Sequence, residues 1–137
     1  MRDFGSLKVG QTLPPFTLLV TPSVIVAGAM ASGDFEPVHH DVPGSRARGT
    51  PDIFINILTT NGYVQRYVSD FLAPAVQIRA LKLRLGVPTY AGDTLRFTGQ
   101  VSRKREEGDK GIVEIAVSGA NGLGQHVTAT VTVEMPR

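Results

Sequence analysis

The segment TPDIFINILTTNGYVQRYVSDF, residues 50–71, decides the fold that this chain of 137 residues is expected to adopt. Thr50 can cap a helix, Pro51 suits a first turn, and the charge of Asp52 opposes the positive end of the helix dipole. The pattern therefore predicts a helix from about Asp52 to about Phe71, about 30 Å long at 1.5 Å per residue. Its first half is apolar nearly all round, which predicts burial on several sides.

The part of the chain after Pro74 alternates apolar and polar residues, as strands with one buried face do. The alternation predicts four strands, and its slip at Ala80-Leu81 predicts a β-bulge. By the same alternation His126 is expected on the outer face of the last strand, with a structural role. The residues expected to face the core are Val76, Ile78, Leu81, Leu83, Leu85, Leu95, Phe97, Gly99, Val101, Val113, Ile115, Val117, Val127, Ala129, Val131 and Val133.

Helical segments followed by strands with mostly short turns predict an α+β fold, in which an antiparallel sheet wraps around the long helix. No repeat or second domain interrupts residues 1–137, so we expect a single domain. Tyr63 and Tyr67 of the helix are expected in its core. One sheet leaves part of the helix and an edge strand uncovered, and we therefore expect a dimer.

The chain before the long helix predicts less regular structure. Residues 1–15 are expected to form an irregular lead-in, followed by a short strand over residues 16–20. Thr21 and Pro22 predict the start of a helix that ends near Ser32, with Gly33 at its end. The β-branched run at residues 24–26 leaves a strand as the alternative.

The segment SGDFEPVHHD, residues 32–41, concentrates groups that can move protons, with two of the three histidines and three carboxylates. Pro37 prevents Asp34 and His39 from sharing one regular helix, so we expect both in a turn or loop. A carboxylate and an imidazole held together there can act as an acid/base pair on water or a thioester.

Three other interpretations of these residues stay open. Asp34 can be a loop-forming or capping carboxylate, and His39 can be a histidine satisfied in the core. A metal site from His39, His40 and Asp41 is disfavoured, because adjacent histidines lack the spacing of zinc proteases, and we predict no metal. His40 and Asp41 are expected to support the loop.

The composition excludes several classes of protein. Apolar residues make up 42% and charged residues 19%, which is an ordinary globular balance. Without cysteine the chain has neither a disulfide framework nor a thiolate nucleophile. A net charge of +2, with aromatic residues not interleaved among basic ones, makes a nucleic-acid surface unlikely. No signal-peptide or transmembrane pattern is present, so we expect a soluble, cytoplasmic protein that does not bind membranes.

Two motifs resemble those of the MaoC-like (R)-specific enoyl-CoA hydratases. The first is Ser32-Gly33-Asp34-x-x-Pro37-Val38-His39-x-Asp41, and the second is Pro88-x-x-x-Gly92-Asp93-Thr94-Leu95. A closer resemblance is to the small MaoC-like subunit of bacterial steroid side-chain enoyl-CoA hydratases. It is carried by Phe35-x-x-Val38-His39-His40-Asp41, residues 52–58, Val64-Gln65-Arg66-Tyr67-Val68, residues 83–88 and residues 126–131. The family usually has Asn where this chain has Glu36.

The resemblance implies a hot-dog fold and a hydratase that adds water to a 2-enoyl-CoA thioester with a bulky, sterol-derived acyl group. It also implies pairing with a second MaoC-like subunit in a heterodimer or heterotetramer, with a homodimer as the alternative. The resemblance implies no cofactor other than the CoA of the substrate. Asp34 and His39 are then the catalytic pair, and a hot-dog thioesterase or a non-catalytic scaffold subunit are the rival functions.

Hydration also needs donors for the thioester oxygen and cations for CoA. Backbone N–H groups near Ile55 and Asn56, at the start of the expected helix, suit the oxyanion. Basic side chains suit the CoA phosphates, although a solvated charged face is the more common role of each. The candidates are Arg46, Arg48, Lys82 and Arg84.

Overall fold

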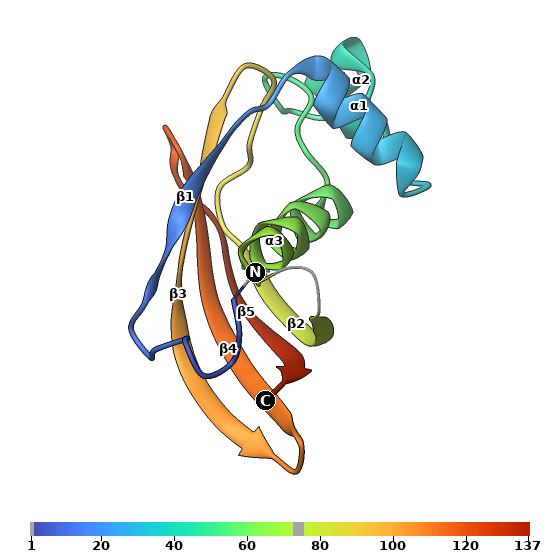
Figure 1. Cartoon of the computed structure of the whole chain (residues 1–137). Coiled ribbons are helices and arrows are strands. Elements are labelled where there is room, and N and C mark those ends of the chain that lie inside the picture. Colours follow the sequence, from blue (N-terminus) through green and yellow to red (C-terminus); the bar gives the residue numbers. More distant parts are fainter. Residues whose placement is uncertain (1, 73–75) are drawn as a thin grey trace.

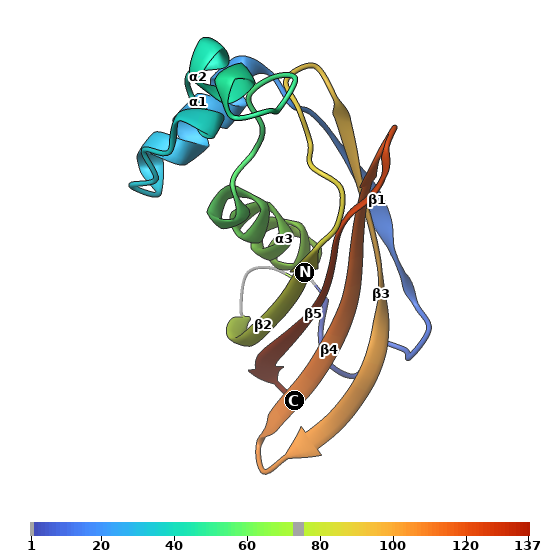
Figure 2. The same ribbon diagram turned by 180° about the vertical axis from the view of Figure 1, so that it is seen from behind.

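A computed structural model describes residues 2–72 and 76–137. Five antiparallel strands form one sheet in the order β1-β3-β4-β5-β2. The sheet curves around helix α3 (Figures 1 and 2). The α+β hot-dog architecture expected from the sequence is therefore confirmed. The strands are β1 (Thr12–Leu19), β2 (Gln77–Leu85), β3 (Thr94–Glu107), β4 (Lys110–Asn121) and β5 (Gly124–Pro136).

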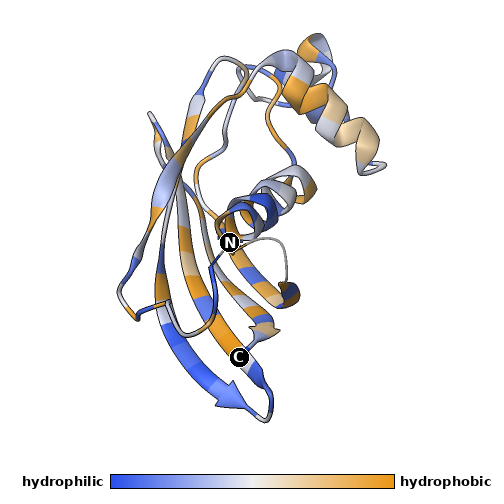
Figure 3. Ribbon diagram, in the orientation of Figure 1, coloured by the Kyte–Doolittle hydropathy of each residue, from blue (hydrophilic) through white to orange (hydrophobic). Residues whose placement is uncertain are grey.

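Helix α3 (Ile57–Leu72) buries one face against the sheet. Val64 and Val68 are fully buried, and the ring of Tyr67 lies 6.0 Å from that of Phe97 on β3. Most of the expected core residues of the sheet, such as Val113 and Val131, are likewise buried, but Leu85 at the end of β2 is 39% exposed, contrary to the prediction. The charged end of the β3–β4 hairpin extends beyond this core as a hydrophilic strip (Figure 3).

The start of α3 differs from the prediction of a helix from Asp52. The preceding residues are extended, because their backbone groups bind two loops: Phe54 N–H donates to the Val38 carbonyl and Ile55 N–H to that of Thr89. Asn56 rather than Thr50 caps the helix, since its Oδ1 accepts the Thr59 N–H at 3.0 Å. The apolar residues before Ile57, which were predicted to begin the helix, therefore form an extended segment between loops. Pro51 lies outside the helix.

The N-terminal strand is longer than predicted. β1 begins at Thr12 and includes Pro14 and Pro15, which the sequence analysis assigned to an irregular lead-in. Its pairing with β3 shifts register between Leu13 and Phe16. Proline is tolerated here because β1 is an edge strand, where a missing N–H leaves no ladder partner unsatisfied.

Three short helical elements connect β1 to α3. Helix α1 (Pro22–Ala31) has Thr21 as its predicted cap, with Thr21 Oγ1 accepting the Val24 N–H at 3.1 Å. A 3₁₀ turn, η1 (Pro37–His39), and helix α2 (Val42–Ala47) follow. α1 and α2 lie together at one end of the molecule, beyond the start of α3 (Figure 1).

Two irregularities of the sheet affect side-chain direction. The β2–β5 register shifts between Ile78 and Ala80, next to the predicted bulge. The β4–β5 register also shifts between Gly119 and Ala120. This second shift brings both His126 and Val127 into the interior, so the prediction of an outer-face His126 is wrong.

The boundary of the strand region at Pro74 lies outside the described residues. Within the described residues, no helix has both the length and the apolar character needed to cross a membrane.

Candidate active site

Asp34 is positioned by the end of α1. Gly33 adopts a φ of 70°, which a glycine reaches without steric cost. The Gly33 N–H donates to the Met30 carbonyl and the Asp34 N–H to the Ala29 carbonyl, which together form a Schellman motif. The sequence Ser-Gly-Asp therefore ends the helix and places the carboxylate directly after it.

His39 is positioned by the 3₁₀ turn that Pro37 begins. Its ring is buried and stands edge-on to Phe54, with 4.9 Å between ring centroids. Its Nδ1 lies 2.7 Å from the Phe54 carbonyl oxygen. A carbonyl only accepts, so Nδ1 carries the proton, and Nε2 of the neutral ring has a free lone pair.

The two side chains converge as the motif predicted. His39 Nε2 lies 3.5 Å from Asp34 Oδ2, and the side chains of His39 and Asp34 are 10% and 24% exposed. The amide of Asn56 donates to the same Oδ2 at 3.0 Å and to Ser32 Oγ at 2.9 Å. The Asn56 hydrogen bond is the largest cause of a lowered pKa of Asp34.

The arrangement is suited to holding a water molecule between two bases. An ionised Asp34 and the neutral Nε2 of His39 are both acceptors, so neither satisfies the other. A water that donates to both is polarised and has its oxygen free to attack. After that attack, a protonated His39 can return the proton as an acid.

Free backbone amides lie beside this pair at the start of α3. The first turn of a helix leaves N–H groups without intrahelical partners, which here are those of Asn56, Ile57 and Leu58, because Asn56 caps Thr59. The positive end of the dipole adds to their attraction for an oxyanion. The Ile55 N–H is bound to Thr89 and is not free, contrary to the prediction; the role of the Asn56 N–H stays a prediction.

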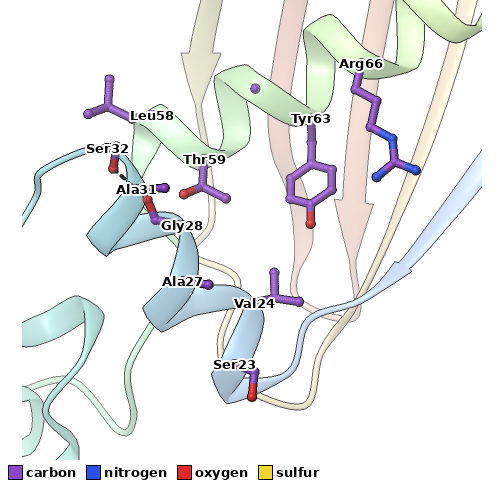
Figure 4. A pocket seen from close by; sticks show the side chains of 11 residues that line it. Ser23, Val24, Ala27, Gly28, Ala31, Ser32, Leu58, Thr59, Tyr63 and Arg66 are labelled. Atoms are coloured by element: carbon purple, nitrogen blue, oxygen red, sulfur yellow. Dashed lines mark hydrogen bonds between the residues drawn. The ribbon is translucent and has the colours of Figure 1, made fainter.

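The pair lies between two cavities. One, of about 320 Å³, is lined by His39 and Asn56 on one side and by Val87 and His126 on the other. The second, of about 690 Å³, lies between α1 and α3 and reaches Ser32, which binds Asn56 (Figure 4). The first cavity therefore reaches His39 directly, and the second ends at Ser32, which binds Asn56 beside Asp34.

Comparison with known proteins places this geometry in a family. No family model matches the chain. A curated relative, the beta subunit of 3-oxo-4,17-pregnadiene-20-carboxyl-CoA hydratase from Mycobacterium tuberculosis, is 47% identical over 127 residues. The match covers 93% of this chain and 95% of the relative. The chain belongs to the MaoC-like hydratase family.

Solved structures agree with the fold of a MaoC-like chain. The crystal structure of the ChsH1–ChsH2 complex from Mycobacterium tuberculosis matches with a TM-score of 0.88 and 47% identity, covering 93% of this chain and 98% of the matched chain. An (R)-hydratase from A. caviae matches with a TM-score of 0.86 at 20% identity, covering 96% and 98% of the two chains. The second likeness shows the fold alone.

The departure of this MaoC-like chain at Glu36 is accommodated by a new ion pair. Glu36 Oε2 accepts a hydrogen bond from Arg48 at 2.7 Å, with both side chains more than half exposed. Its backbone N–H still donates to Asp34 Oδ1, at 3.3 Å. The altered side chain therefore points to α2 and leaves the loop that carries Asp34 intact.

The four basic CoA candidates do not gather at one place. Arg48 is paired with Glu36 of the loop that carries Asp34, and the Arg46 Nε donates to the Pro51 carbonyl. Lys82 and Arg84 alternate on β2 with residues that pack on the core, and they therefore lie on the outer face of the sheet. A CoA-binding role of any of the four stays a prediction.

His126 has the structural role expected from the sequence, but it lies in the interior and not on the outer face. Its Nδ1 donates to the Val87 carbonyl at 2.7 Å, and its Nε2 accepts from Thr60 Oγ1 at 2.9 Å. Burial lowers the pKa of His126, which favours this neutral form. The histidine thus fixes β5 and the loop after β2 to the first turns of α3; only the sheet bulge, not the alternation, reveals this.

His40 supports the loop, as expected, because its Nε2 donates to the Phe35 carbonyl at 3.0 Å. His39 Nδ1 and His40 Nε2 are therefore hydrogen-bonded to two different backbone carbonyls. No group of three or more His, Asp or Glu side chains in residues 2–72 and 76–137 could hold a metal ion.

Proposed function

We propose that this chain is the catalytic subunit of an enoyl-CoA hydratase that adds water to a 2-enoyl-CoA thioester. The observation that carries the proposal is the convergence of Asp34 and His39 on one point, with Asn56 holding the carboxylate. This pair stands beside free amides at the start of α3, which suits a reaction with a negatively charged intermediate.

The proposed reaction uses each group once. Asp34 and His39 polarise a water, whose oxygen bonds to the β-carbon while one of its protons moves to the pair. The electrons of the C=C bond shift onto the thioester oxygen, which the amides at the start of α3 stabilise. The proton then returns from the pair to the α-carbon, and the addition is syn if one face of the substrate serves both steps.

The substrate class follows from the relative. The curated hydratase subunit is named for a 3-oxo-4,17-pregnadiene-20-carboxyl-CoA substrate, so a steroid side-chain acyl-CoA is the proposed substrate here. The cavity of about 690 Å³ beside Ser32 has room for a bulky acyl group. No cofactor beyond the CoA of the substrate is proposed, and we place the reaction in the cytoplasm.

A second MaoC-like subunit is the proposed partner. The matching crystal structure is a ChsH1–ChsH2 complex, which pairs two different chains. In this chain the start of α3 carries two apolar side chains, Ile57 and Leu58, that are about half exposed. Such residues at the mouth of the site suit coverage by another subunit.

The test is hydration by the chain co-purified with its partner from the native host. Asp34→Asn and His39→Gln are each expected to lower kcat about 10²- to 10⁴-fold, the usual loss of a general acid or base. The measurement is loss of the conjugated absorbance of a 2-enoyl-CoA. His40→Gln, which changes the neighbouring imidazole, is the matched control and is expected to retain activity.

The rival functions give different results in the same assay. A thioesterase releases free thiol without prior loss of the conjugated absorbance. A scaffold subunit leaves activity intact in both Asp34→Asn and His39→Gln, and that result would contradict the proposal.

A further inference from the structure

The cavity between α1 and α3 has one end at Ser32, which binds Asn56 beside Asp34, and another end that the proposed reaction does not use. Its volume is about 690 Å³. Ser32 and Thr59 lie at the end next to Asn56, and Val24, Tyr63 and Arg66 lie at the other (Figure 4). The α1 wall between the two ends consists of the small residues Ala27, Gly28 and Ala31.

Small residues on α1 explain the shape of this cavity. A Cβ at Gly28 would clash with the side chain of Thr59, so glycine allows the two helices to touch there. From this contact α1 diverges from α3 towards Ser23 (Figure 4). The space therefore widens away from the catalytic end, as a rigid, bulky group requires and a straight acyl chain does not.

The far end carries hydrogen-bond donors. The side chains of Tyr63 and Arg66 extend from α3 into this space, and none of the other lining residues bonds to the Tyr63 hydroxyl (Figure 4). By contrast, the hydroxyl of Tyr67, one turn further along, donates to the Pro14 carbonyl at 2.9 Å. Arg66 has a 3.5 Å contact with Asp70, and its guanidinium carbon lies 5.6 Å from the ring centroid of Phe16. The side chains of Arg66 and Asp70 are mostly exposed, so this ion pair holds the guanidinium weakly.

The two ends are separated by a distance that suits a fused-ring skeleton. Tyr63 lies seven residues after Asn56, which is about 10 Å along the axis at 1.5 Å per residue. Near the catalytic end, Thr59 Oγ1 is the single buried side-chain polar atom without a hydrogen-bond partner in the described part of the chain. That atom is covered by Gly28, so the polar groups at this end come from Ser32, and those at the other end from Tyr63 and Arg66.

We infer that this cavity is a specificity site for a polycyclic acyl group that bears a ketone at the end distant from the thioester. The Tyr63 hydroxyl donates a hydrogen bond to the ketone oxygen, and the Arg66 guanidinium lies beside it as a second donor. The apolar rings pack on Val24 and Ala27. The inference rests on the proposed hydratase function and names two residues that select its substrate.

The test compares two 2-enoyl-CoA thioesters with the same fused rings, one with the distal ketone and one with CH₂ in its place. Tyr63→Phe in the co-purified complex is expected to lower kcat/KM for the ketone substrate about three- to tenfold, the value of one hydrogen bond. It is expected to leave kcat/KM for the deoxy substrate unchanged. Arg66→Gln is likewise expected to lower kcat/KM for the ketone substrate and to leave kcat/KM for the deoxy substrate unchanged.

Two controls separate recognition from folding. Tyr67→Phe removes a hydroxyl from the same helix outside this cavity. It is expected to lower kcat/KM for both ring substrates equally or not at all. Ala27→Phe fills the cavity from an exposed position and is expected to reduce hydration of the fused-ring substrates but not of a short 2-enoyl-CoA.

Equal effects of Tyr63→Phe on both ring substrates, or none, would overturn the inference and leave the proposed function standing. Failure of the unmodified complex to hydrate any of the three thioesters overturns the proposed function and the inference with it.

Discussion

At the scale of single residues, Asn56 connects the fold to the chemistry. Its Oδ1 caps α3 by accepting a hydrogen bond from the Thr59 N–H, and its Nδ2 donates hydrogen bonds to Asp34 and Ser32. The residue is 2% exposed, so its amide has few alternatives in water. The start of α3 and the carboxylate of Asp34 are therefore held by the same side chain.

Replacement of Asn56 is expected to change the pH dependence of the reaction. The Asn56 hydrogen bond lowers the pKa of Asp34, so Asn56→Ala raises that pKa. Asp34 then becomes protonated, and inactive as a base, at a higher pH, and the acidic limb of kcat/KM against pH shifts upward. Asn121→Ala removes an amide that binds Pro88 and Thr89 and is the control expected to leave that limb in place. An unshifted limb in Asn56→Ala would remove Asn56 from the site.

At the scale of secondary structure elements, the end of α1 determines where Asp34 stands. The Schellman motif requires the left-handed conformation at Gly33, and both of its hydrogen bonds end at carbonyls of α1. The start of α3 and the end of α1 are joined by Ser32, Asp34 and Asn56. The site is thus a junction of two helix termini.

Two glycine variants are expected to have opposite effects on stability. Gly33→Ala forces a side chain into the left-handed region and is expected to lower the free energy of unfolding by about 1–2 kcal/mol. Gly62→Ala, within α3 and with nothing near its Cβ, is expected to raise it by about 0.5–1 kcal/mol. Chemical denaturation of both variants measures the difference. Equal stabilities of the two would show that the positive φ at Gly33 carries no cost.

At the scale of the whole molecule, the apolar residues around the site remain uncovered. We call Met30, Phe35, Ile57 and Leu58 the apolar rim; they are between 41% and 65% exposed. The hydrogen bonds of Asn56 to Ser32 and Asp34 bring these segments together. An apolar rim beside the catalytic pair suits an interface with the proposed partner subunit.

Charge in the apolar rim is expected to weaken the complex. Ile57→Asp is expected to reduce the amount of partner that co-purifies with the chain, because it buries a carboxylate in an apolar interface. Val9→Asp places the same charge at another exposed apolar residue, in the turn before β1, and is expected to leave co-purification unchanged. Light scattering of both complexes gives their masses. Full retention of the partner by Ile57→Asp would exclude the rim as the interface.

The sequence by itself determined the class of fold and predicted that Asp34 and His39 lie together, as they do. Alternation of period two is a local property of a strand, and the four strands after residue 76 follow it. Gly33 and Pro37 restrict the conformation of the backbone locally, so the turn that carries Asp34 and His39 could also be predicted from the sequence. The short spacing of the motif then brought the two side chains together.

Only the tertiary structure decided the start of α3 and the roles of Asn56 and His126. The residues before Asn56 have helix-start signals, but hydrogen bonds to Val38 and Thr89 hold them extended. His126 follows the pattern of an outer residue, but a register shift with β4 turns it inward. Val38 and Thr89 are distant in sequence from the segment that they hold, and the bulge depends on how β4 and β5 pair, so local propensity encodes neither.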